Sequence, residues 1–152
     1  GCGVGGGRVG VVWAVRGRTP PASCEACVPN HAVGHKVRKE DELSKANSAT
    51  IPSPSGNGYI TGYFVRPFSQ DTRAATPTKL PTVLVVHENR GLNPHTEDVA
   101  RRFALENFMA FAPDALSTVG GYPNDDYKGG LLFGKIDQTK VMSDFVACAQ
   151  WL

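Results

Sequence analysis

The run His-Glu-Asn-Arg-Gly at residues 87–91 has the clearest chemical potential, because it places three ionisable side chains in close succession. It directly follows residues 82–86, a continuous β-branched and aliphatic segment typical of a strand covered on both faces. Active sites of open α/β sheets lie at the carboxyl ends of such strands. The run is equally consistent with a solvated turn, in which Gly91 is the hinge and Glu88 pairs with Arg90. Position alone leaves both interpretations open.

A second candidate is a pair of cysteines, Cys24 and Cys27, followed by His31 and His35. These side chains could bind a metal, but a two-Cys, two-His zinc finger needs about a dozen residues between its pairs. A redox Cys-x-x-Cys should open a helix after a strand. Neither context is present, so the sequence predicts no bound metal. A small metal-binding module at Cys24–His35 remains an alternative function.

No cofactor is expected. The glycine-rich start contains a G-x-G-x-x-G pattern, but in this sequence no strand precedes it to aim the glycines at a helix, as a dinucleotide fingerprint requires. Cys148 falls on the apolar face of an expected helix, where a buried and inert thiol is the simplest interpretation.

Composition excludes several classes of partner. The 152 residues are 41% hydrophobic and 20% charged, with a formal net charge of +2. No apolar run reaches the roughly 18 residues of a membrane-spanning helix. Lysine and arginine form no basic stripe interleaved with aromatic residues, which nucleic-acid binding would need. We therefore expect neither a membrane nor a nucleic acid as partner. The four cysteines lack the paired spacings of a disulfide framework, which slightly favours a reducing, cytoplasmic compartment.

The chain divides into two parts by composition. Residues 1–50 show no sustained hydrophobic period, and glycine and proline interrupt the one short apolar run. An irregular or disordered segment is therefore expected over 1–50. From Ile51 onward short elements alternate with turns, which predicts a folded domain over 51–152.

A strand–helix–strand unit determines the expected fold class. Residues 82–86 form its first strand, Asn93 and Pro94 supply the cap and first residue of a helix ending near Asn107, and residues 108–112 form its second strand. Such a unit favours parallel pairing, so the fold class is α/β. The other expected elements are an antiparallel strand at 59–66, a short helix at 127–135 and a final helix capped by Asp137.

Three stretches carry a family resemblance: residues 82–103 (TVLVVHENRGLNPHTEDVARRF), 111–116 (FAPDAL) and 119–126 (VGGYPNDD). In these stretches the chain resembles the dienelactone hydrolase family, and the likeness covers about residues 51–152. The resemblance implies the N-terminal half of an α/β-hydrolase sheet, mixed and mostly parallel, with flanking helices.

The resemblance also implies an activity and two site residues. Members of that family attack esters and lactones with a Cys-His-Asp triad, so the full-length form would act on a small ester or lactone. Glu88 corresponds to the carboxylate that contacts the resting nucleophile thiol and is displaced when substrate binds. The backbone N–H of Asn89 would lie beside the oxyanion hole. Asp114 and the 120–126 loop would border the same edge.

The sequence departs from the family pattern at the nucleophile. The family's elbow, Gly-x-Cys-x-Gly, has no counterpart among the serines and cysteines of these 152 residues. His87 and His95 precede the expected nucleophile, whereas the triad histidine follows it, so neither is given that role. We therefore expect a domain truncated before the elbow and inactive alone. The alternative is a non-catalytic remnant or a pseudoenzyme that binds a partner through an open sheet edge.

Overall fold

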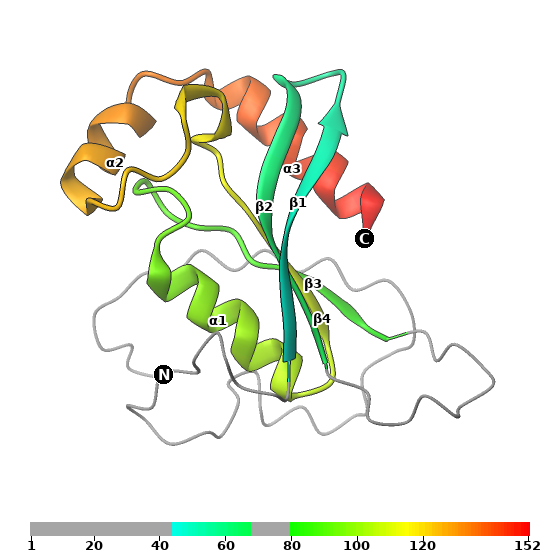
Figure 1. Ribbon diagram of the computed structural model, residues 1–152. Helices are drawn as coiled ribbons and strands as arrows, with labels where there is room; N and C mark the ends of the chain where they lie inside the picture. The colour runs from blue at the N-terminus through cyan, green and yellow to red at the C-terminus, as the bar shows by residue number, and fades with distance from the viewer. Residues whose placement is uncertain (1–43, 68–79) are drawn as a thin grey trace, which may run out of the picture.

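A computed structural model describes residues 44–67 and 80–152 (Figure 1). Of the irregular segment expected over residues 1–50, residues 1–43, which include the candidate metal ligands Cys24–His35, lie outside the described residues. The elements run in the order β1 (Ser44–Ser53), β2 (Gly58–Pro67), β3 (Thr82–Leu84), α1 (Pro94–Leu105), β4 (Met109–Pro113), a 3-10 turn (Ser117–Val119), α2 (Asp126–Phe133) and α3 (Gln138–Trp151).

The four strands form one mixed sheet in the order β1-β2-β4-β3. β1 and β4 both pair antiparallel with β2, whereas β3 pairs parallel with β4, with Val83 opposite Ala110. The predicted α/β class and the strand–helix–strand unit are therefore confirmed. In the described part of the sheet, β3 and β4 of the strand–helix–strand unit form the one parallel pair. The other two pairs, β1–β2 and β2–β4, are antiparallel.

β1 was not expected from the sequence. The boundary placed between residues 50 and 51 falls inside this strand, which begins at Ser44. Residues 44–50 lack the alternating large apolar side chains that mark a half-buried strand, and Asn47, Ser48 and Thr50 are exposed. Among the described strands β1 lies at the edge of the sheet, and it pairs along its whole length with β2. Its backbone hydrogen bonds to β2 stabilise the part before Thr50, whereas Ile51 is buried in the core.

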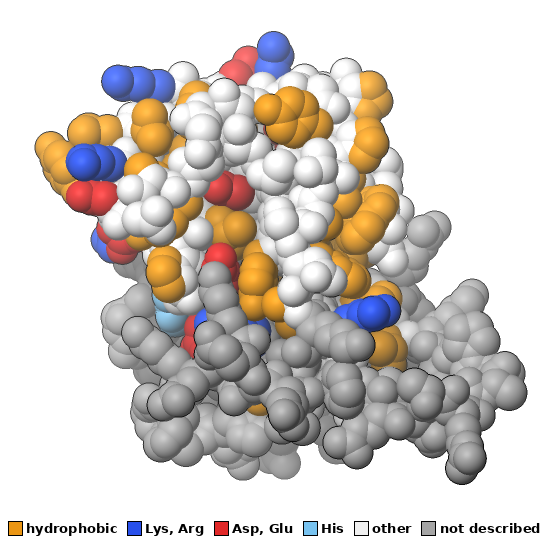
Figure 2. Space-filling view, in the orientation of Figure 1, with side chains coloured by type: hydrophobic (Ala, Val, Ile, Leu, Met, Phe, Trp, Pro, Cys, Tyr) orange, Lys and Arg blue, Asp and Glu red, His pale blue; other side chains and the backbone are white. Residues whose placement is uncertain are grey.

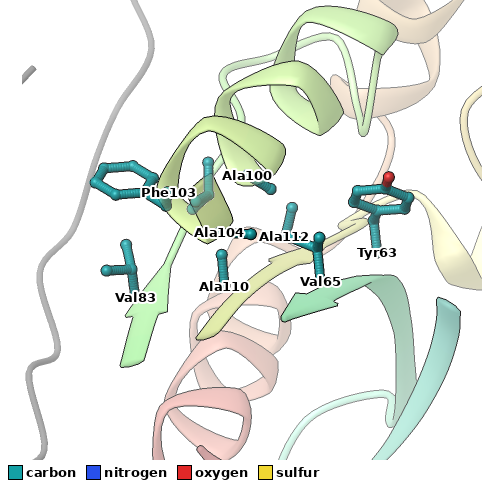
Figure 3. Close-up of a cluster of buried hydrophobic side chains, with 9 residues drawn as sticks. Tyr63, Val65, Val83, Ala100, Phe103, Ala104, Ala110 and Ala112 are labelled. Carbon is teal, nitrogen blue, oxygen red and sulfur yellow. The ribbon is translucent and has the colours of Figure 1, made fainter. Parts of the chain in front are cut away.

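α1 begins and ends where the sequence predicts. The side chain of Asn93 accepts a hydrogen bond from Thr96 N at 3.0 Å, Pro94 occupies the first helical position, and Asn107 adopts a left-handed conformation with φ of 64° after the last turn. Its buried face covers one side of the sheet (Figure 3). On this side, side chains of α1, β2, β3 and β4 form a buried hydrophobic cluster. It includes Tyr63, Val65, Val83, Ala100, Phe103, Ala104, Ala110 and Ala112.

α3 covers the opposite face of the sheet (Figure 1). Successive strand residues point to opposite faces, so Leu84 and Phe111 pack with α3 while their neighbours pack with α1. Asp144 of α3 is 2% exposed and accepts hydrogen bonds from the backbone and side-chain nitrogens of Asn57, at 2.9 and 2.6 Å. These bonds attach the helix to the turn between β1 and β2.

The outer surface of α2 and α3 carries large hydrophobic side chains, and those over α2 are visible at the left of Figure 2. The most exposed are Tyr127, Met142, Leu131, Val146 and Trp151. In residues 44–67 and 80–152, no helix has the length and apolar character that crossing a membrane requires.

Candidate functional site

The loop 87–91 and the start of the segment after β4 lie side by side. Because β3 and β4 are parallel, with Leu84 opposite Phe111, their carboxyl ends meet at one edge of the sheet. The Ala115 N–H donates a hydrogen bond of 2.9 Å to His87 Nε2. The sequence prediction that loop 87–91 occupies the carboxyl end of a buried strand is confirmed.

The His87 side chain is buried, at 5% exposed, whereas Glu88, Asn89 and Arg90 of the same loop are exposed. Since Nε2 accepts from Ala115, the proton of the neutral ring lies on Nδ1, which donates to the carbonyl of Glu88. Burial lowers the pKa of His87 below its usual 6.5, and the Glu88 carbonyl and the Asp114 carboxylate counter this shift. The ring is therefore neutral at physiological pH.

The lowered pKa of His87 predicts a loss of stability in mild acid. The unfolded chain takes up the proton first as pH falls below about 6.5, so this contribution to the free energy of unfolding is complete above that pH and is lost below it. The slope is at most about 1.4 kcal/mol per pH unit. Urea unfolding between pH 7.5 and 5.5 should show this pH dependence of the free energy of unfolding in the parent chain. It should persist in His95→Gln, a control in which an exposed histidine is replaced. His87→Gln should lack it, and equal slopes in all three chains would contradict the assignment.

Asp114 connects the loop to the segments that follow β4. One carboxylate oxygen, Oδ1, accepts from the backbone nitrogens of Leu92 and Leu116, at 3.3 and 3.0 Å, and Oδ2 accepts from Tyr122 N at 2.8 Å. The residue is 5% exposed. Gly91 completes the turn with φ of 89°, a left-handed conformation that favours glycine.

Arg90 pairs with Asp126 rather than with Glu88. Arg90 NH1 lies 2.9 Å from Asp126 Oδ2, and Tyr122 Oη donates to Asp126 Oδ1 at 2.8 Å. The hydrogen bonds from Tyr122 and Arg90 lower the pKa of Asp126, while loss of hydration and the Asp126 hydrogen bond raise the pKa of Tyr122 to about 12. This network fixes the start of α2 beside the loop.

Glu88 and Asn89 occupy the exposed part of the loop. In residues 44–67 and 80–152, the Glu88 carboxylate has no hydrogen-bond or ion-pair partner, and the Asn89 N–H donates no hydrogen bond. A carboxylate and a backbone donor are thus adjacent and available at the edge of the sheet.

The profile of the dienelactone hydrolase family matches residues 70–152, which include the loop 87–91 and all three backbone partners of Asp114. This chain belongs to the dienelactone hydrolase family. The match confirms the family that the sequence motifs indicated.

Relatives of this dienelactone hydrolase family member differ in length. A protein named as a hydrolase fragment, YghX, of Escherichia coli (strain K12) is 49% identical over 111 residues, which are 73% of this chain and 90% of the relative. A protein named as a carboxymethylenebutenolidase in the same organism is 32% identical over 76% of this chain and 41% of its own length. A Salmonella typhi protein of that name is 35% identical with the same coverage. The match thus spans 41% of the length of each of these carboxymethylenebutenolidases.

A crystal structure agrees with the fold. The structure, described as a dienelactone hydrolase from Klebsiella pneumoniae subsp. pneumoniae MGH 78578, is 27% identical and aligns with a TM-score of 0.50. The alignment covers 70% of this chain and 43% of that one. The four-stranded mixed sheet with flanking helices is therefore an α/β-hydrolase type of sheet.

Two features of this dienelactone hydrolase family site were missed from the sequence. The burial of His87 could have been recognised, because Val83, Val85 and His87 share one side of an extended segment and the first two are fully buried. The pairing of Arg90 with Asp126 joins residues 36 positions apart, and no local pattern indicates it.

The remaining chemical groups of the described residues do not add a second site. Within residues 44–67 and 80–152, no three His, Cys, Asp or Glu side chains are grouped to hold a metal ion. Burial raises the pKa of Cys148 to about 12, and the Asp144 carboxylate adds to the shift. Its thiol is therefore protonated at neutral pH and is a poor nucleophile.

Proposed function

We propose that this chain supplies one part of an ester- or lactone-hydrolase site, in which Glu88 and the Asn89 N–H act together with a cysteine nucleophile. The observation that carries the proposal is that both groups are exposed, adjacent and without a partner among the described residues. Family membership supplies the reaction class.

The two groups have different roles in the proposed reaction. A thiol resting beside Glu88 would donate a hydrogen bond to its carboxylate. The thiol first gives its proton to a general base of the complete site, and the thiolate sulfur attacks the substrate carbonyl. The π electrons move to the oxygen, and the Asn89 N–H donates to the resulting oxyanion. When the oxyanion collapses, the C–O bond breaks, the leaving oxygen takes up that proton, and a thioester remains. Water then hydrolyses the thioester to the carboxylic acid and restores the thiol.

The 152 residues are not expected to complete this reaction alone. They contain no Gly-x-Cys-x-Gly motif, and Cys148 is buried with its thiol protonated. An oxyanion donor without a nucleophile has no acyl intermediate to stabilise. Purified chain should show no saturable hydrolysis of 4-nitrophenyl acetate. Saturable turnover that Glu88→Ala abolishes would contradict this expectation.

A chimera tests the positive part of the proposal. In it, the matched segment of this chain replaces the matched segment of the Escherichia coli carboxymethylenebutenolidase. We expect ester hydrolysis, and Glu88→Gln should lower kcat/KM at least about 100-fold. Glu106→Gln, which changes an exposed glutamate at the end of α1, is the matched control and should stay within about twofold. A folded chimera in which both variants retain parent activity would overturn the role of Glu88.

A further inference from the structure

His87 lies directly before the two proposed site residues, yet the proposed reaction does not use it. We propose that His87 is the positioning residue for the Asn89 N–H: its ring holds the Glu88 carbonyl and thereby orients the N–H of the same peptide group away from the protein interior. This inference rests on the proposed function, which gives that N–H its role.

The geometry of one peptide group links the two residues. The carbonyl of Glu88 and the N–H of Asn89 belong to the same planar unit, and in a trans peptide they point in opposite directions. No cis peptide bond occurs in the described residues. Because His87 Nδ1–H donates to that carbonyl, the carbonyl points at the buried ring and the N–H points away from it.

The ring is itself held from three directions. The Ala115 N–H donates to Nε2 at 2.9 Å, which fixes the tautomer with the proton on Nδ1. Phe133 of α2 and Phe145 of α3 meet the ring edge-to-face, with centroids 6.1 and 6.2 Å away. Rotating the ring by half a turn would replace Nδ1 with a carbon atom and lose the bond to Glu88. The orientation of the peptide group therefore depends on three separate elements.

Polarisation adds to orientation. A hydrogen bond accepted by an amide carbonyl draws electron density toward its oxygen, which makes the N–H of the same group a better donor. The Asn89 N–H has no partner among the described residues, so the improved donor is available to an incoming oxygen.

The first test uses the isotope-labelled 152-residue chain and needs no variant. Long-range proton–nitrogen spectra should show the His87 proton on Nδ1 and not on Nε2 at pH 7.5. A through-bond coupling should connect Nδ1 to the Glu88 carbonyl carbon. A proton on Nε2 would overturn the proposal directly.

The second test compares two variants that each keep one half of the ring's function. His87→Asn places an amide N–H where Nδ1 was. In His87→Gln the amide lies near the former position of Nε2, where its oxygen can accept from Ala115, and no donor is left at the position of Nδ1. In His87→Asn, the Asn89 N–H should retain its residual dipolar coupling and an order parameter near about 0.85. In His87→Gln, the order parameter should fall below about 0.6 and the Glu88 carbonyl resonance should shift.

Unchanged Asn89 signals in His87→Gln would overturn the proposal, and so would equal changes in both variants, because the ring would then act by packing alone. These spectra involve no substrate. Positioning can therefore fail while the chimera still depends on Glu88, and the chimera can be inactive while the spectra still show positioning. If a variant does not fold, the position of the His87 ring proton in the parent chain decides whether the proposal stands.

Discussion

Asp114→Ala should lower the free energy of unfolding by about 3–5 kcal/mol. The substitution leaves three backbone N–H groups, those of Leu92, Leu116 and Tyr122, without their acceptor. Each buried donor left unpaired costs about 1–3 kcal/mol, and Leu116 is fully buried. Guanidinium unfolding followed by circular dichroism measures the change.

Asp114→Asn and Asp137→Asn are the matched controls for that result. Asp114→Asn keeps one acceptor oxygen but turns an amide N–H toward a backbone donor, so an intermediate loss of about 1–3 kcal/mol is expected. Asp137 caps α3 at an exposed position, where asparagine caps equally well, and its substitution should have almost no effect. A loss below about 1 kcal/mol for Asp114→Ala would show that the three N–H groups find other partners.

Gly129→Val should destabilise the chain by about 3 kcal/mol and displace α2 from the loop. A Cβ atom at Gly129 would lie 2.2 Å from the carbonyl oxygen of Arg90. The neighbour is backbone rather than a flexible side chain, so the helix or the loop must move, and overpacking of this kind costs about 1–3 kcal/mol or more. Thermal and guanidinium unfolding give the stability, and the Arg90 and Asn89 amide resonances report the displacement.

Gly130→Val separates this clash from the general effect of removing a glycine. A Cβ at Gly130 would have the carbonyl oxygen of Asn89 as its nearest neighbour, at 3.8 Å, which is an ordinary contact. Valine and glycine have similar helix propensities within about 0.5 kcal/mol, so this variant should be near neutral. Equal losses at Gly129 and Gly130 would mean that α2 does not rest on the loop.

The local part of the fold was predictable because its signals are short in sequence. Asn93, Pro94 and Asn107 mark both ends of α1 by capping chemistry alone, and the apolar run from Thr82 marks β3. β1 was missed for the opposite reason. Its residues before Thr50 have little β-propensity of their own, and pairing with β2 makes an extended conformation favourable there.

The candidate site was predictable in place but not in its contacts. The position of Glu88 and Asn89 after a buried strand indicated the correct edge of the sheet. The partners of that loop come from distant segments: Ala115 contacts His87, Asp126 pairs with Arg90, and Gly129 approaches the Arg90 backbone. A pattern within one element does not specify which residues of two other elements meet it, so these contacts required the structure.

The contact between His87 and Phe145 also affects the order of events during synthesis. The chain emerges from the ribosome with its N-terminal part first, and 58 positions separate the histidine from this aromatic partner on α3. The same helix must also reach the turn at Asn57 through Asp144. Such long-range closures form late, because the intervening chain loses much entropy when they are made. The loop that carries Glu88 and Asn89 therefore reaches its final geometry only after translation has passed α3.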